Sequence, residues 1–145
     1  MMKCKIQKLH DDAILPEYSH NGDSGMDVYA VEDCYIAPMT RELIPLGFCV
    51  SIPTLTEIQV RPKSGLALKN GLTVLNTPGT IDSNYRGELC VILFNSSDEA
   101  YQVKKGQKVA QIVLCPVLHV EQWSIVKDIE SETSRGSGGF GSTGI

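Results

Sequence analysis

Hydrophobic and polar residues alternate over short segments of this chain, and turn-forming residues interrupt the segments at brief intervals. In TEIQVRP (56–62), for example, Ile58 and Val60 alternate with polar neighbours. The chain holds 13 glycines and 7 prolines, and apolar spacing of the helical kind is not sustained for three turns. The pattern predicts a β-rich protein, with strands over 5–9, 27–31, 34–38, 43–52, 56–62, 72–76, 87–95, 100–105, 108–117 and 122–128.

Many short strands at even spacing favour a closed or doubled sheet, which avoids exposed sheet edges. The runs CVILF (90–94) and IVLCPV (112–117) are almost wholly apolar. They indicate strands covered on both faces, one by the barrel interior and the other by a subunit contact. We therefore expect an all-β fold of the jelly-roll or β-barrel type. At most one short helix is expected, over 64–71, with Ser64 as its cap and Gly71 as its stop.

The composition changes near Ser131, where SETSRGSGGFGSTGI begins and core-forming residues almost disappear. A segment of this kind has little apolar surface to bury. We expect a β-barrel domain over 1–130 and a mobile, glycine-rich arm over 131–145.

Charge and cysteine content narrow the classes of function. The net charge of -4 and the pI near 5.3 do not suit a protein that holds long nucleic acids by neutralising phosphates. A small phosphorylated ligand needs only a few local cations. Five cysteines without a CxxC pair fit reduced thiols in the cytosol. The opening residues lack the apolar region of a signal peptide, and no apolar run reaches membrane-spanning length, so we expect a cytoplasmic protein without membrane contact.

Four segments could form a phosphate site from loops and strand ends: RPKSGLA, PGTIDSNYRGE, KVAQIV and RGSGGFGSTG. None is a Walker motif. In the last segment the glycines offer backbone N–H groups, Ser142 and Thr143 can donate to phosphate oxygens, and Arg135 can form paired charge-assisted bonds. Phe140 could stack on a base, which favours a lid that orders on ligand binding. The composition alone is equally typical of a flexible tail without function.

Other candidate residues also have structural explanations that the residues alone leave open. Asp82 follows a predicted hairpin and Asp27 begins a predicted strand, and aspartate is common in turns and caps. Lys63 and Ser64 could bind an anion or lie in a solvated loop. The three histidines lie far apart in the sequence, so a histidine-based triad has little support.

Five segments, in this order, resemble the five motifs of the trimeric dUTPase family: GDSGMDVYA, RPKSGLALKNG, NTPGTIDSNYRGE, GQKVAQIV and RGSGGFGSTG. The resemblance covers nearly the whole chain. It implies a jelly-roll-like subunit (a β-clip fold) in a homotrimer, with active sites between subunits and the arm closing over a neighbour's site. The implied activity is Mg²⁺-dependent hydrolysis of dUTP to dUMP and pyrophosphate, which keeps uracil out of DNA and supplies dUMP for dTTP synthesis.

The resemblance also implies roles for residues of the third motif. Asp82 is the general base, which deprotonates a water that attacks the α-phosphorus in line. The hairpin from 76 to 85 holds uracil mainly through backbone groups, with Asn76 as the side-chain reader and Gly79, Thr80 and Ile81 among the binding residues. Tyr85 lies under the deoxyribose and excludes a 2'-hydroxyl.

The phosphates are assigned by resemblance to residues of the other motifs, with Gly65 allowing close backbone approach; these residues are Lys63, Ser64, Gln111, Arg135, Ser142 and Thr143. Phe140 caps the uracil, next to Gly141. Asp27 anchors Mg²⁺ through bound waters. Two positions depart from the family pattern. Lys63 stands where arginine is usual, so its phosphate contacts lose the planar fork. Asn84 stands where aspartate is usual.

Three other functions are compatible with parts of the sequence. A dCTP deaminase would share the fold, but the TLE-like segment expected after a histidine-glycine stretch is missing and the arm is of the dUTPase type. A dUTP-dependent protein-interaction module would need the same nucleotide site but not Asp82 as a base. A structural jelly-roll subunit would leave NTPGTIDSNYRGE and the arm without a purpose.

Overall fold

The computed structural model of the protein describes residues 3–129 and 133–142. These residues form eleven strands and one short helix. In chain order the elements are β1 (Lys5–Lys8), β2 (Met26–Tyr29), β3 (Cys34–Ile36), β4 (Arg41–Pro45), β5 (Phe48–Ser51), β6 (Thr56–Arg61), α1 (Ser64–Asn70), β7 (Leu72–Val74), β8 (Gly79–Asp82), β9 (Cys90–Asn95), β10 (Tyr101–Val103) and β11 (Lys108–Pro116).

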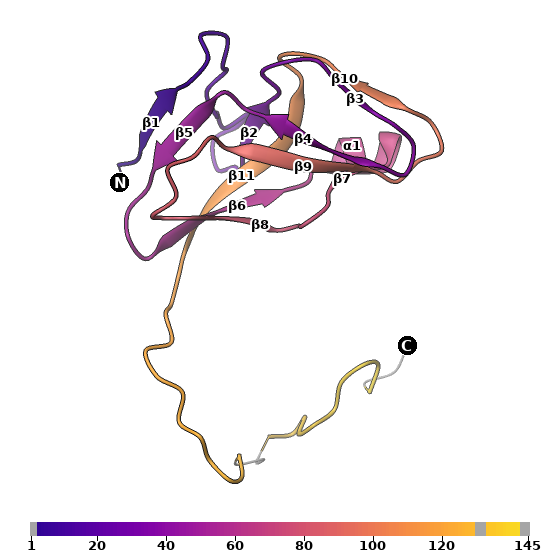
Figure 1. The fold of residues 1–145 in the computed structure, drawn as a ribbon. Helices are drawn as coiled ribbons and strands as arrows, with labels where there is room; N and C mark the ends of the chain where they lie inside the picture. Colours follow the sequence, from indigo (N-terminus) through magenta and orange to yellow (C-terminus); the bar gives the residue numbers. More distant parts are fainter. Residues whose placement is uncertain (1–2, 130–132, 143–145) are drawn as a thin grey trace.

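The strands build small antiparallel sheets that wrap around one core (Figure 1). The largest has the order β2-β11-β6-β8, a second has the order β4-β9-β7, and two pairs, β1-β5 and β3-β10, complete the body. Most neighbours in these sheets are distant in sequence, as expected for a jelly roll. The predicted all-β fold with a single short helix is confirmed.

The core follows from the alternation that the sequence displays. In β6 the side chains of Thr56, Ile58 and Val60 are buried, whereas the residues between them are half-buried. β9 repeats this pattern, with half-buried side chains on its outer face. The largest side chains that are almost completely buried come from several strands and their connections: Phe48, Ile36, Ile44, Leu46, Leu72, Leu89, Leu93 and Ile112.

The single strand expected over 43–52 is two strands, β4 and β5. The strand is interrupted between Pro45 and Phe48, where Gly47 has a left-handed φ of 76°, and the partner strand changes from β9 to β1. A Cβ at Gly47 would lie 2.8 Å from Val31 Cγ2 and 2.9 Å from Ala13 Cβ. Only glycine fits this position, because both the backbone angle and the close neighbours exclude a side chain.

The helix α1 was predicted almost to the residue, but its start was assigned wrongly. Lys63 occupies the N-cap position, without a side-chain capping hydrogen bond, and Ser64 is already helical. Gly71 ends the helix in the left-handed conformation, with φ of 66°, and its N–H bonds back to the helix. The stop residue is therefore confirmed and the capping role of Ser64 is not.

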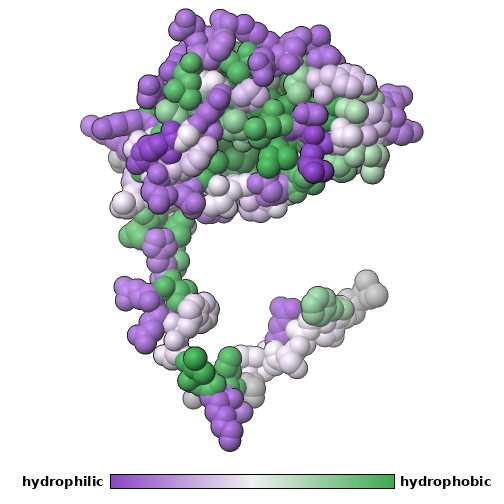
Figure 2. Space-filling view, viewed as in Figure 1, coloured by the Kyte–Doolittle hydropathy of each residue, from purple (hydrophilic) through white to green (hydrophobic). Residues whose placement is uncertain are grey.

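After β11 the chain leaves the body (Figure 1). Val117 N–H still donates to Leu55 O at 2.9 Å, and residues 118–129, named here the extension, are exposed. The strand expected over 122–128 does not form, since no partner strand lies beside it. Apolar side chains protrude along the extension in Figure 2. The expected boundary between residues 130 and 131 falls at 130–132, outside the described residues.

No helix within the described residues has the length and apolar character needed to cross a membrane.

Candidate active site

A polar cavity of about 480 Å³ lies where β2, β11 and the start of α1 meet. We name it the phosphate pocket. It is lined by Ser19, Asp23, Ser24, Gly25, Asp27, Lys63, Ser64, Gly65 and Gln111. The structure therefore brings together the candidate residues of the first, second and fourth motifs, which lie up to 84 positions apart in the chain (27 to 111).

Strand pairing explains why these residues meet. Gln111 in β11 is the Cα partner of Asp27 in β2 on one side and of Arg61 in β6 on the other. Pro62 and Lys63 follow Arg61 directly and carry the chain into α1. Gln111 Nε2 donates to Pro62 O at 2.9 Å, which fixes the amide side chain at the pocket wall.

Asp27 is the centre of a charged network at the base of the phosphate pocket. Lys63 Nζ bonds to its Oδ1, while Lys108 Nζ lies 2.7 Å and Ser19 Oγ 3.0 Å from its Oδ2. Burial alone would raise the pKa of Asp27, but hydrogen bonds from Lys108, Lys63 and Ser19 outweigh it and hold the pKa below the ordinary value. Asp27 is therefore a firmly ionised, almost buried carboxylate.

A second cavity, of about 240 Å³, lies beside the β7–β8 connection and β9. We name it the hairpin pocket. Its lining includes all five candidate uracil- and sugar-binding residues of the third motif, Asn76, Gly79, Thr80, Ile81 and Tyr85. The remaining walls are mostly apolar and come from β4, β6, β7 and β9. Apolar residues gather on this face of the molecule, over β9, in Figure 2.

Local contacts hold the hairpin pocket in shape. The Thr77–Pro78 peptide bond is cis, and the chain turns there between β7 and β8. Gly79 is buried, and a Cβ on it would lie 3.3 Å from Asn76 Nδ2. The Tyr85 hydroxyl donates to Glu88 O at 3.0 Å. An apolar cavity with a few fixed polar groups is typical of a site for a flat, partly polar ring.

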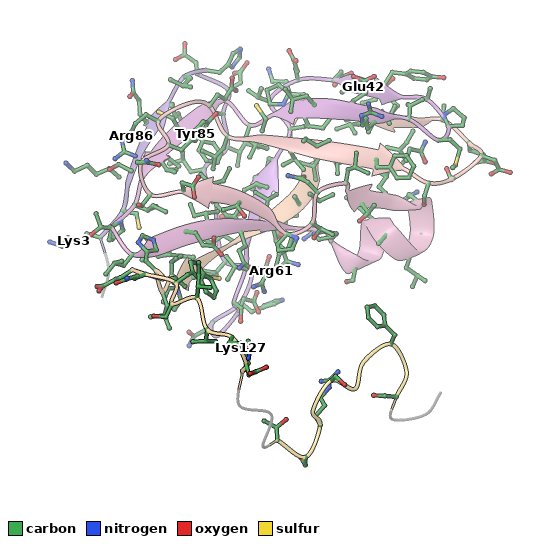
Figure 3. The ribbon with its side chains drawn as sticks, turned by 60° about the horizontal axis from the view of Figure 1, so that its bottom comes forward. Lys3, Glu42, Arg61, Tyr85, Arg86 and Lys127 are labelled. Atoms are coloured by element: carbon green, nitrogen blue, oxygen red, sulfur yellow. The ribbon has the colours of Figure 1, made fainter. Side chains whose placement is uncertain are left out.

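Asp82 and the phosphate pocket lie far apart in one chain. Asp82, at the end of β8, is the Cα partner of Glu57 in β6, and Lys63 follows Glu57 by six residues. An extended chain rises about 3.3 Å per residue, so roughly 20 Å separates the two positions. In Figure 3, Tyr85, which follows Asp82 in the next turn, and Arg61, which precedes Lys63, project from separate parts of the ribbon.

The described part of the arm, residues 133–142, does not contact either pocket. Its hydrogen bonds are local, such as Arg135 Nε to Gly138 O at 2.8 Å. The Phe140 side chain is fully exposed. Gly141 and Ser142 are exposed as well. Thr143 lies outside the described residues. The structure therefore does not bring the candidate arm residues to the body of their own chain.

The donor groups of the phosphate pocket suit a hard cation. Asp23, Asp27, Ser19 and Ser24 supply carboxylate and hydroxyl oxygens. Within the described residues, no group of three or more His, Cys, Asp or Glu side chains is placed to hold a metal alone. The set fits Mg²⁺, which often takes only one or two protein carboxylates and completes its shell with phosphate oxygens and water.

Several residues of the phosphate pocket are not among those expected from the sequence. Ser19, Ser24 and Gly25 line it, and Lys108 pairs with Asp27 from behind. Ser24, Gly25 and Lys108 lie inside the quoted segments GDSGMDVYA and GQKVAQIV, so the segments pointed to the right part of the chain. Their roles depend on strand register, which the sequence does not reveal.

Comparison with known proteins gives the same assignment along the whole chain. A family model described as dUTPase matches residues 11–144. The chain is 54% identical to a deoxyuridine 5'-triphosphate nucleotidohydrolase of a Picosynechococcus species, over 99% of each chain. It is 51% identical to the enzyme of the same description from Clostridioides difficile, over 100% of each chain.

The fold is similarly matched among solved structures. The Staphylococcus bacteriophage 80alpha dUTPase with dUPNHPP superimposes with a TM-score of 0.89 at 26% identity, covering 99% of both chains. The family model, the full-length relatives and the shared fold all indicate the same family. The chain belongs to the dUTPase family.

Proposed function

We propose that the protein hydrolyses dUTP to dUMP and pyrophosphate in active sites shared between the subunits of a homotrimer. The observation that carries this proposal is the division of the candidate residues between two pockets. The hairpin pocket suits a base and sugar, the phosphate pocket suits a triphosphate, and each gathers the residues that the family resemblance assigns to that part of dUTP.

The hairpin pocket supplies specificity. Backbone groups of Gly79, Thr80 and Ile81 and the amide of Asn76 pair with the polar edge of uracil, whereas cytosine would present a donor where the pocket also donates. Tyr85 packs against the deoxyribose, and its hydrogen bond to Glu88 O keeps the ring in place. A 2'-hydroxyl would collide with this ring, so UTP is excluded.

The phosphate pocket binds the triphosphate through Lys63, Ser64 and Gln111, with the backbone of Gly65 close to the phosphate oxygens. Asp82 accepts a proton from the attacking water, which adds in line to the α-phosphorus as pyrophosphate leaves. Mg²⁺ held by Asp27 through waters would neutralise charge that develops on the phosphate oxygens.

Shared sites follow from the distance between the two groups of residues. Asp82 lies about 20 Å from Lys63 in one chain by strand geometry, which is too far for both to act at one α-phosphate. A second subunit that brings its hairpin pocket to the phosphate pocket of the first removes this difficulty. The arm of a third subunit, with Arg135, Phe140, Gly141, Ser142 and Thr143, then closes the site.

Exposed apolar surface supports assembly. In the extension, Leu118, Trp123 and Ile125 are at least 82% exposed. A third cavity, of about 540 Å³, has a mostly apolar lining from β1, β5 and the largest sheet, which includes Ile6, Met26 and Leu114. Exposed apolar groups of this size and an apolar groove on one chain are typical of surfaces that become buried between copies.

Mixing two inactive variants tests hydrolysis and site sharing together. Asp82→Asn removes the base, and the double variant Lys63→Ala/Gln111→Ala removes two phosphate ligands, so each homotrimer should have very low activity. If the chains are unfolded, mixed in equal amounts and refolded, random assembly gives about a quarter of the sites both native residues, and activity should return to about that level. Activity that stays at the level of the separate variants would contradict shared sites. A wild type inactive towards dUTP would contradict the function itself.

A further inference from the structure

Lys108 is a charged residue at the phosphate site that none of the assigned roles uses. Its Nζ lies 2.7 Å from Asp27 Oδ2 and 3.4 Å from Ser19 Oγ, and it lies over the Tyr29 ring, 5.9 Å from the centroid. Lys108 does not line the phosphate pocket. It approaches Asp27 from the side away from Lys63, which bonds to the other carboxylate oxygen.

A β-bulge in β11 brings Lys108 to this position. Residues three apart in a regular strand point to opposite faces, and Lys108 and Gln111 are three apart. The register against β2 shifts between Lys108 and Ala110, and Val109 and Ala110 are consecutive buried residues. The additional residue at the bulge shifts the alternation of side chains by one position. The side chains of Lys108 and Gln111 therefore point to the same face of the sheet, and both reach the surroundings of Asp27.

Two positively charged groups surround the single negative charge of Asp27. The carboxylate is 7% exposed and pairs with two ammonium groups, those of Lys63 and Lys108. Lys63 lines the phosphate pocket, and its ammonium group is paired with Asp27. An ammonium group has three donors, so Lys63 can contact a phosphate oxygen while it remains near Asp27, but the two anionic partners then share one positive charge. Without Lys108, Asp27 and the phosphate oxygens would compete for this ammonium group, and a water-bridged Mg²⁺ would be the only other counter-ion of a nearly buried carboxylate.

We propose that Lys108 is a positioning residue for the phosphate site, which supplies a second ammonium group to Asp27 so that Lys63 can share its donors between Asp27 and the phosphate oxygens of the nucleotide. This inference rests on the proposed binding of a triphosphate in the phosphate pocket. Lys108 acts through Asp27 and does not contact the substrate. The ring of Tyr29 packs against Lys108 and helps to hold the lysine beside Asp27. The Tyr29 hydroxyl donates to Glu17, which in turn keeps the ring in place.

Binding measurements on Lys108→Met test the proposal. Affinity for a non-hydrolysable dUTP analogue with Mg²⁺ is measured by calorimetry, and affinity for deoxyuridine, which has no phosphate, by NMR titration. Loss of the Lys108 ammonium group should weaken analogue binding about tenfold, since Asp27 then competes with the phosphate oxygens for Lys63, and change deoxyuridine binding less than twofold. Lys108→Arg should restore most of the analogue affinity.

Lys104→Met is the matched control, because Lys104 forms an exposed ion pair with Asp33 at 3.2 Å, away from both pockets.

An Asp27→Asn background distinguishes positioning from direct contact. If Lys108 acts through Asp27, Lys108→Met should cost nothing further in that background. A loss that persists there would mean that Lys108 binds the phosphates itself and would overturn the proposal. If Lys108→Met weakens the binding of the analogue and of deoxyuridine equally and also lowers the Tm, Lys108 has a purely structural role, and the proposal is wrong.

If Lys108→Met does not fold, Lys108→Gln retains most of the side chain and takes its place. A wild type that binds deoxyuridine but not the analogue would refute the phosphate pocket and this inference together, whereas analogue binding without hydrolysis would count against the proposed function only.

Discussion

Gly25 and Gln111 are in such close contact that any side chain at position 25 would collide with the glutamine. A Cβ on Gly25 would lie 2.3 Å from Gln111 Oε1, 3.1 Å from its Cδ and 3.3 Å from its Cβ. Gln111 is at the same time held by its hydrogen bond to Pro62 O. The glycine therefore sets the position of a proposed phosphate ligand.

Gly25→Ala should move Gln111 away from Pro62 and widen the phosphate pocket. We expect a loss of about 1–3 kcal/mol in unfolding free energy from the overpacking, and an increase of about tenfold in KM for dUTP. Thermal unfolding and steady-state kinetics check both. Gly65→Ala is the control for stability, since its Cβ would meet nothing within 4 Å, and alanine should stabilise α1 by up to about 1 kcal/mol. An unchanged KM in Gly25→Ala would count against Gln111 as a phosphate ligand.

Gly87→Ala should relax the discrimination against ribonucleotides. A Cβ on Gly87 would lie 2.3 Å from Tyr85 Oη and 2.6 Å from its Cζ, so the half-exposed ring must swing out of position. The ratio of kcat/KM for UTP to that for dUTP should rise about tenfold or more, because the ring no longer blocks the 2'-hydroxyl. Tyr85→Phe retains the ring and should raise the ratio much less. Equal ratios in Gly87→Ala and the wild type would mean that Tyr85 is not the residue that excludes the 2'-hydroxyl.

Asn95→Asp should destabilise the fold severely without touching either pocket. Asn95 is completely buried, and its Nδ2 donates to Glu99 O at 2.7 Å and to Ile36 O at 3.3 Å. A carboxylate would direct an oxygen at these carbonyl oxygens and bury an unpaired charge, so we expect a loss of about 3 kcal/mol or more. Urea unfolding measures the difference. Asn21→Asp, at an exposed position, should change stability by less than about 0.5 kcal/mol.

The raised pKa of Tyr29 predicts that the stability of the fold decreases at alkaline pH. Burial and the hydrogen bond to Glu17 raise its pKa to about 12. The unfolded chain loses this proton near pH 10, so the stabilisation is fully present below about pH 10 and is lost as the pH rises towards 12. Tyr29→Phe should therefore lose Tm less steeply than the wild type between pH 9.5 and pH 11 or so. Tyr18→Phe, at an exposed tyrosine, should follow the wild type. Parallel curves for all three proteins would disprove the role of Tyr29.

Local features of the fold could be predicted from local sequence. The alternation in TEIQVRP predicts which side of β6 is buried, and the spacing from Ser64 to Gly71 predicts the helix and its end, because these depend on neighbouring residues. The interruption at Gly47 was missed because an apolar run continues on both sides of it. The strand expected over 122–128 has the right residues but no partner strand in the single chain.

The arrangement of the site depended on contacts between distant residues. The motifs indicate which residues take part, and the pockets bring Asp27, Lys63 and Gln111 together as expected. The motifs do not reveal that Asp82 pairs with Glu57 at the far end of β6, since strand register is a long-range property. Lys108 was missed for a similar reason, because only the bulge in β11 turns it towards Asp27.

Pyrophosphate release from dUTP, dCTP, dTTP and UTP with Mg²⁺, measured on the wild type and Asp82→Asn, tests the central claim most directly. The wild type should hydrolyse dUTP selectively. Asp82→Asn should lose about two to four orders of magnitude in kcat while still binding the dUTP analogue, as expected when a general base is removed from an intact site. Comparable rates for all four nucleotides, or full activity in Asp82→Asn, would contradict the account.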